Sequence, residues 1–108
     1  MKPIALSLAS IFLAAGIGSD VCFGKLLKRA HSIAAEDWTR DGKPTWWTWR
    51  PAEFVAPNWY YRAPRWRWLQ SLPPYIETDH SARRLHNAHR FLLALAVAAW
   101  ATFLFLEL

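Results

Sequence analysis

Residues 91–106 read FLLALAVAAWATFLFL, an uncharged run that decides the fold we expect. At about 1.5 Å per residue, a helix of this length falls slightly short of the ~30 Å hydrocarbon core of a bilayer, and its flanks from Arg90 to Leu108 close the gap. A second apolar run, residues 4–23, lies at the other end of the chain and is also long enough to cross. The sequence therefore predicts an all-α membrane protein with two transmembrane helices arranged as a hairpin.

The N-terminal run also has the pattern of a cleaved secretory signal, because Lys2 precedes an apolar stretch that contains the small residues Ala14 and Gly16. The residues before Cys22 do not resemble a lipoprotein cleavage box. We expect the run to be retained as a membrane span. A single cysteine excludes an internal disulfide, in agreement with a reducing compartment for the residues between the spans.

The distribution of charge predicts the orientation in the membrane. The chain has 13 Lys and Arg against 8 Asp and Glu, and all of these cations except Lys2 lie between residues 24 and 90. Because cationic flanks resist translocation, we expect a bacterial cytoplasmic (inner) membrane protein with a cytoplasmic loop and two periplasmic termini. Basic residues beside the spans are expected to anchor it at the interface: Lys25, Lys28, Arg29, Arg83, Arg84 and Arg90.

Hydrophobic periodicity and turn signals divide the chain into five segments. Apolar residues after Gly24 recur at helical spacing as far as about Asp37, which predicts one helix or two abutting helices from Pro3 onwards. Gly42 and Pro44 are stop signals, and Thr78 or Asp79 is expected to cap the last helix. The expected segments are a transmembrane helix (1–23), its amphipathic cytoplasmic extension (24–40), a Pro/Trp-rich extended strap (41–78), a basic interfacial helix start (79–90) and a second transmembrane helix (91–108).

The strap, residues 41–78, contains six of the seven prolines, which excludes a long helix or a central strand. We expect it to be mostly irregular, with at most a short helical turn around residues 65–71. Its many aromatic residues argue against disorder and suggest that it covers a surface. The residues expected to bind a partner or lipid are Trp46, Trp47, Trp49, Arg50, Trp59, Tyr60, Tyr61, Arg62, Arg65, Trp66, Arg67 and Trp68.

Two interpretations of the strap are compatible with each other. Tryptophan, tyrosine and arginine gather at membrane interfaces that carry anionic phospholipids, and the same residue types anchor protein partners in grooves. Nucleic-acid binding is disfavoured, because the strap is tethered between two spans and contains no recognisable binding fold.

His86 and His89 are the candidate cofactor-binding residues, because they lie three residues apart on one expected helix face. This spacing allows one-sided contact with a metal or a tetrapyrrole, but no cluster of Cys, Asp or Glu completes a metal site. The alternative is that this face contacts phosphates or a partner. No cofactor is expected, although lipid or pigment contacts are compatible with the pattern, and no catalytic motif is evident.

The spans carry one acidic residue and two rows of small residues. Asp20, near the end of the first span, is expected to pair with Lys25, with Arg90 or with another basic residue that flanks the second span. Small residues let helix backbones approach closely, either each other or a host. The two rows are Ser10, Ala14 and Gly18 on the first span and Ala94, Ala98 and Thr102 on the second.

Four short motifs occur in order along nearly the whole chain: Leu26-Leu27-Lys28-Arg29, Gly42-Lys43-Pro44, Tyr75 with Asp79, and Arg83-Arg84. With a span at each end, this layout resembles universal stress protein B and similar small bacterial inner-membrane proteins. The resemblance implies a two-span inner-membrane protein without a defined catalytic role. The Trp-rich residues 46–68 depart from that pattern.

These observations predict a non-catalytic accessory subunit of a larger respiratory or photosynthetic membrane complex. Such a subunit would be held by an integral membrane host through its spans and strap. The principal alternative is a free-standing, stress-related membrane protein, as a monomer or homodimer, whose strap binds anionic lipid. A third is a tetrapyrrole- or metal-binding subunit that uses the interfacial histidines.

Overall fold

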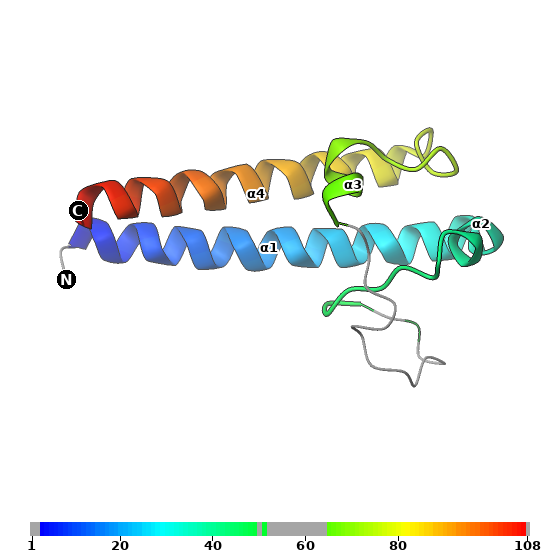
Figure 1. The fold of residues 1–108 in the computed structure, drawn as a ribbon, viewed down its shortest axis with the longest axis horizontal. Coiled ribbons are helices and arrows are strands. Elements are labelled where there is room, and N and C mark those ends of the chain that lie inside the picture. Colours follow the sequence, from blue (N-terminus) through cyan, green and yellow to red (C-terminus); the bar gives the residue numbers. More distant parts are fainter. Residues whose placement is uncertain (1–2, 50, 52–64, 108) are drawn as a thin grey trace.

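The computed structural model describes residues 3–49, 51 and 65–107. Four helices follow in chain order: α1 (Pro3–Ile33), α2 (Ala35–Arg40), α3 (Arg65–Gln70) and α4 (His80–Glu107). α1 and α4 lie antiparallel, so both termini are at one end and α2 lies at the other (Figure 1). The predicted all-α fold with two long apolar helices is confirmed, and the one β bridge whose two residues both lie in the described part of the chain pairs Trp46 with Trp49.

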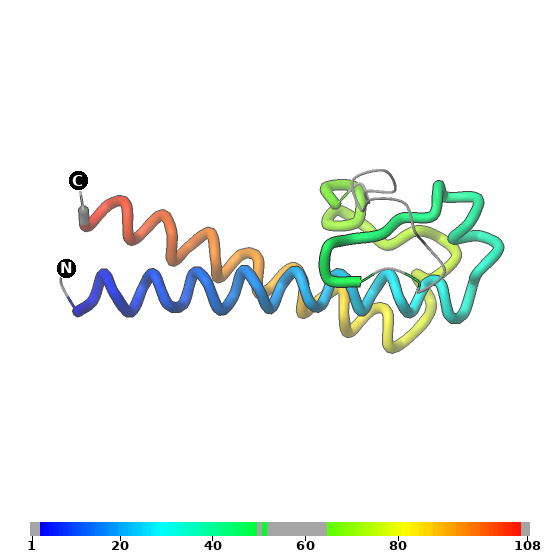
Figure 2. Tube along the Cα trace, turned by 90° about the horizontal axis from the view of Figure 1, so that it is seen from below, coloured from blue at the N-terminus to red at the C-terminus, as the bar shows by residue number. Residues whose placement is uncertain are grey.

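Both long helices exceed the thickness of a bilayer core. α1 has 31 residues and α4 has 28, and each is long and apolar enough to cross a membrane. At 1.5 Å per residue they measure about 46 and 42 Å, so an untilted crossing of a ~30 Å core leaves roughly ten residues of each helix outside. The loop segments and α3 gather along this projecting end (Figure 2).

Near the termini the two helices contact each other through small side chains. Ala5 and Ala15 of α1 and Ala96 and Ala99 of α4 are buried. The large apolar side chains of these segments point away from the partner helix, with Phe105 79% exposed. A water-soluble hairpin would bury its large side chains, whereas helices in lipid approach through small ones. This half of the hairpin therefore has the side-chain distribution of a lipid-facing structure.

The small-residue rows were expected to contact either the other long helix or a host, and only Gly18, which faces Leu92, lies between α1 and α4. The rest of the two rows is exposed: Ser10, Ala14, Ala94, Ala98 and Thr102. As an interface between α1 and α4 that prediction is wrong. Alanine is frequent on several faces of both helices, so spacing alone did not identify the face that pairs. Contact with a host remains a prediction for the exposed rows.

The projecting end contains a compact apolar core. Its buried residues come from both long helices, α2, α3 and the segment before α4: Phe23, Leu26, Leu27, Ala30, Trp38, Trp68, Ile76 and Ala82. Full burial of a large apolar side chain contributes about 1.5–3 kcal/mol, so these contacts stabilise the hairpin end. Trp68 was predicted to bind a partner or lipid, but it is fully buried in the chain's own core.

α2 is separated from α1 by a break at Ala34, whose φ is −146°. α1 and α2 are thus two abutting helices, and Gly24 lies inside α1 without interrupting it. α2 ends in a Schellman motif, in which Gly42 has a φ of +93° and the Lys43 N–H donates to the Trp38 carbonyl at 3.1 Å. The turn redirects the chain, and the Trp38 indole donates to the Pro44 carbonyl at 3.0 Å.

Asp79, the residue before α4, caps the N-terminus of this helix and also links it to α1. Its Oδ2 accepts a hydrogen bond from the Ala82 N–H at 2.8 Å, as expected of a helix cap. Arg29 donates to both carboxylate oxygens, at 3.0 and 2.9 Å. The Arg29 hydrogen bond, and then that of the Ala82 N–H, lower the pKa of Asp79. Arg29, expected as a membrane-interface anchor, thus joins the two long helices.

Gly24 allows the strap to approach α1 closely. A Cβ at this position would overlap Thr48 Oγ1 and lie 3.1 Å from Thr48 Cβ and 3.2 Å from Trp49 Cβ. These atoms belong to the turn between the two paired tryptophans, Trp46 and Trp49. Only a residue without a side chain fits against this turn.

We therefore expect Gly24→Ala to weaken the seating of the strap. Overpacking costs about 1–3 kcal/mol, and it should lower the midpoint of thermal unfolding in detergent micelles and speed protease cleavage of the strap. Gly16→Ala is the matched control, since nothing lies within 4 Å of the added methyl group. Equal unfolding midpoints and equal cleavage rates in Gly24→Ala and Gly16→Ala would contradict the close approach of Thr48 to Gly24.

Candidate functional site

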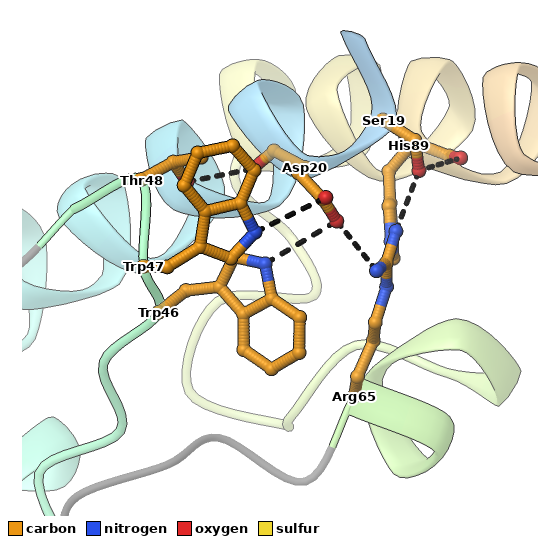
Figure 3. Close-up of polar contacts among 7 residues, drawn as sticks. All are labelled: Ser19, Asp20, Trp46, Trp47, Thr48, Arg65 and His89. Carbon is orange, nitrogen blue, oxygen red and sulfur yellow. Dashed lines mark hydrogen bonds and ion pairs between the residues drawn. The ribbon is translucent and has the colours of Figure 1, made fainter. Parts of the chain in front are cut away.

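A polar cluster joins α1, α4 and the strap where the apolar half of the hairpin meets its compact end (Figure 3). We call it the Asp20 cluster. Its members come from α1, from the turn between Trp46 and Trp49, from the start of α3 and from α4. They are Ser19, Asp20, Trp46, Trp47, Thr48, Arg65 and His89.

The Asp20 carboxylate is the centre of this cluster. Its Oδ1 accepts hydrogen bonds from Arg65 Nη1 at 2.5 Å and from the Trp46 indole at 3.3 Å. Its Oδ2 accepts one from the Trp47 indole at 3.1 Å, so two neighbouring indoles point at one carboxylate (Figure 3). Thr48 Oγ1 donates to the Asp20 backbone carbonyl at 2.7 Å. Asp20 was expected to pair with Lys25, Arg90 or another basic residue flanking the second span, and that expectation is wrong, because its partner Arg65 lies on α3.

Arg65 connects this carboxylate to both long helices. Besides Asp20, its guanidinium donates to Ser19 Oγ at 2.8 Å and to His89 Nε2 at 3.1 Å. It also lies over the ring of Trp46, at 5.3 Å from the centroid, a cation–π geometry. One side chain from the first residue of α3 therefore holds the strap against α1 and α4 together.

The geometry of His89 identifies its tautomer. An arginine can only donate, so His89 Nε2 must be the acceptor and the proton lies on Nδ1. The imidazole stacks on the ring of Phe23, with 5.0 Å between the two ring centroids. Its Nδ1 is buried without a hydrogen-bond partner among the described residues. Ser19 Oγ also donates to the His89 carbonyl at 3.1 Å, which adds a direct contact between α1 and α4.

The two histidines predicted as cofactor ligands are both buried and both engaged. His86 Nε2 lies 2.8 Å from the Trp68 carbonyl, and His89 Nε2 accepts from Arg65. In the part of the chain that the structure describes, no three His, Cys, Asp or Glu side chains form a group that could hold a metal. Ligation through Nε2 would require both contacts to open.

A second polar cluster holds the two ends of the strap together. Arg67 Nη2 donates to both oxygens of Asp41, at 2.8 and 2.9 Å, and the Tyr75 hydroxyl donates to Oδ2 at 3.0 Å. Burial first, and then the charge of Asp41, raises the pKa of Tyr75. Arg67, expected to bind a partner or lipid, is therefore paired within the chain, although its side chain remains 54% exposed.

The strap presents only part of its predicted surface to the outside. Trp66 is 78% exposed and Trp47 58% exposed, whereas Trp46 and Trp49 pack against the core. Arg50, Trp59, Tyr60, Tyr61 and Arg62, also predicted to bind, lie outside the described residues. The predicted interface anchors other than Arg29 are exposed on the long helices: Lys25, Lys28, Arg83, Arg84 and Arg90.

Sequence reasoning named Arg65 and His89 separately but did not bring them together. It missed Ser19 and Thr48, whose roles depend on partners 70 and 28 residues away. The one signal in the sequence was Asp20 itself, because an ionisable residue in an apolar helix requires a partner.

No known family model, curated protein or solved structure matches this chain. The resemblance to universal stress protein B accordingly stays a prediction.

Asp20→Asn tests the role of the cluster. The change keeps the size of the side chain but removes the charge facing Arg65, whose side chain is only 20% exposed. Hydrogen bonds to charged groups contribute about 1.5–3 kcal/mol, so we expect a loss of unfolding free energy of this order in micelles and faster protease cleavage of the strap.

Asp37→Asn is the matched control, because the Arg40 and Asp37 side chains of that pair are 74% and 43% exposed. Exposed pairs contribute about 0–1 kcal/mol, so this variant should behave like the wild type. Comparable losses in the two variants would refute a special role for Asp20.

Proposed function

We propose that the protein is a non-catalytic accessory subunit of a larger bacterial membrane complex, respiratory or photosynthetic. The observation that carries this proposal is the exposure of Trp66 and Trp47 on a strap that is itself tied to the hairpin by the Asp20 cluster. The strap supplies the large anchoring side chains, and the exposed small residues of α1 and α4 allow close contact with helices of the host.

Exposed indoles on a fixed support are suited to docking. Tryptophan is among the residues that contribute most to protein interfaces, because a large ring is buried at little conformational cost. Ordering a segment on binding is unfavourable, and a strap already held by Arg65 and Asp20 avoids much of that cost. The loss of water contact by Trp66, 78% exposed in the isolated chain, would then favour association.

The polar groups of the cluster support a structural role. A general base has to present an unused lone pair to its substrate. Both carboxylate oxygens of Asp20 already accept hydrogen bonds, and His89 Nε2 accepts from Arg65. These bonds hold the strap in place and leave little capacity for acid–base work.

The membrane orientation is part of the same proposal. The cations Lys25, Lys28, Arg83 and Arg84 are exposed at the compact end of the hairpin, next to the apolar stretches. The positive-inside rule therefore favours a cytoplasmic strap in the bacterial inner membrane, with both termini periplasmic.

Cysteine labelling tests this orientation. In a Cys22→Ser background, Gln70→Cys adds one exposed thiol at the end of α3. A membrane-impermeant maleimide should label it in inverted inner-membrane vesicles and leave it unlabelled in intact spheroplasts. Cys22→Ser alone gives the background, and labelling in intact spheroplasts would reverse the proposed orientation.

Purification of the tagged chain in mild detergent tests the subunit role. We expect a host protein at a constant ratio to the chain, identified by mass spectrometry, and loss of most of that host from Trp66→Ala, which leaves the Asp20 cluster unchanged. The Trp47→Ala, Trp66→Ala double variant, which also removes one hydrogen bond of that cluster, should lose the rest. Such anchors typically contribute about 2 kcal/mol or more, enough to release a detergent-solubilised complex.

Trp100→Ala is the control, because Trp100 is 50% exposed but lies on the apolar part of α4. It should retain the host. A chain that purifies alone or as a homodimer would contradict the proposal and favour a free-standing, lipid-binding membrane protein. A host that stays with the double variant would exclude these indoles as the anchors.

A further inference from the structure

A groove of about 690 Å³ runs along the outer face of α4 beneath α3. Its volume falls within the range of ligand-sized clefts, about 300–1,000 Å³. The residues that matter for its chemistry are Trp66 and Gln70 on α3 and Arg90, Ala94, Ala98 and Ala101 on α4. None of them belongs to the Asp20 cluster.

The groove is polar at one end and apolar at the other. Arg90 and Gln70 lie at the end nearest the strap, and beyond them exposed alanines at positions 94, 98 and 101 form the floor between larger apolar side chains, among them Leu93 and Val97. Methyl side chains leave room along the helix, so a narrow apolar molecule can lie against the backbone. Trp66 also lines the groove, and its amphipathic indole is a side chain preferred at membrane interfaces.

The length of the groove matches the thickness of one leaflet of a bilayer core. Arg90 and Ala101 are eleven residues apart, about 16 Å along a helix, which is close to half of a ~30 Å hydrocarbon core. A transmembrane helix of a partner would follow the full thickness of the core. An acyl chain starts at the headgroup level and ends near the midplane, as this groove does.

The charge at the polar end selects the headgroup. Arg90 is exposed and forms no ion pair with another described residue, so its guanidinium is available at the groove entrance. A guanidinium matches the geometry of a phosphate through paired N–H donors. None of the described residues that line the groove is acidic, so the Arg90 charge is not neutralised there and favours a lipid of net negative charge over a zwitterionic one.

We propose that this groove binds one anionic membrane phospholipid, with its phosphate at Arg90 and an acyl chain over Ala94, Ala98 and Ala101. The proposal rests on the proposed insertion in a membrane but needs no host. The lipid that occupies the groove belongs to the leaflet on the same side of the membrane as the strap.

Native mass spectrometry of the full chain in detergent micelles tests it, with phosphatidylglycerol and phosphatidylcholine of identical acyl chains as probes. We expect one phosphatidylglycerol per chain at low lipid concentration and weaker binding of phosphatidylcholine. Arg90→Gln should weaken phosphatidylglycerol binding by about tenfold and remove most of the preference between the two lipids. Ala98→Leu, which fills the floor, should weaken binding of both lipids.

Two variants control for charge and volume away from the groove. Arg84→Gln removes the same charge, and Ala14→Leu adds the same volume on the exposed face of α1. Both should bind lipid nearly as the wild type does, and circular dichroism should show unchanged helix content in all variants. Equal losses in Arg84→Gln and Arg90→Gln would reduce the site to general surface charge and overturn the proposal.

A lipid-independent dimer that Ala98→Leu disrupts would also overturn it, because a second copy would then occupy the groove. The outcome is independent of the subunit role, since the isolated chain is measured without any host. Trp66 lines the groove and is also a proposed host anchor, so Arg90→Gln, which changes the groove but neither indole, separates the two proposals. Loss of phosphatidylglycerol binding from this variant with the host retained supports the lipid site without bearing on the docking of the indoles.

Discussion

The pairing of Asp20 with Arg65 is the interaction on which the rest of the structure depends. A carboxylate beside the apolar core of a bilayer is costly unless polar groups compensate it. Here the compensation comes from the strap, through Arg65 and two indoles. The same guanidinium reaches Ser19 on α1 and His89 on α4. One electrostatic requirement therefore positions the irregular part of the chain on both helices.

The hairpin consists of two halves that follow different solvation rules. Towards the termini, small residues such as Ala15 and Ala99 face inwards and large ones face outwards, as lipid permits. At the compact end, Phe23 and Trp68 are buried, as water requires. The Asp20 cluster lies at the change between these halves. The proposed docking surface and lipid groove both begin at this level, where indoles and cations meet the bilayer interface.

Much of the helical layout could be predicted from the chain itself. The uncharged run of residues 91–106, the stop at Gly42 and the cap at Asp79 are local signals, and α3 begins at Arg65 as expected of the one helical turn allowed between prolines. The partners of the polar residues could not be predicted. Asp20 had several cations within plausible reach, and its choice of Arg65, 45 residues away, depends on how the strap returns over α1.

By itself the sequence determined that two apolar helices flank a basic, proline-rich segment, because hydropathy, charge and proline act through local chemistry. Tertiary structure alone decided which tryptophans point inwards. Trp66 and Trp68 are two residues apart and equally aromatic, yet one is 78% exposed and the other is fully buried. That difference arises because α3 lies against α4 with one face, and its direction follows from Arg65 reaching Asp20. Burial is a property of the packed faces, which no local pattern encodes.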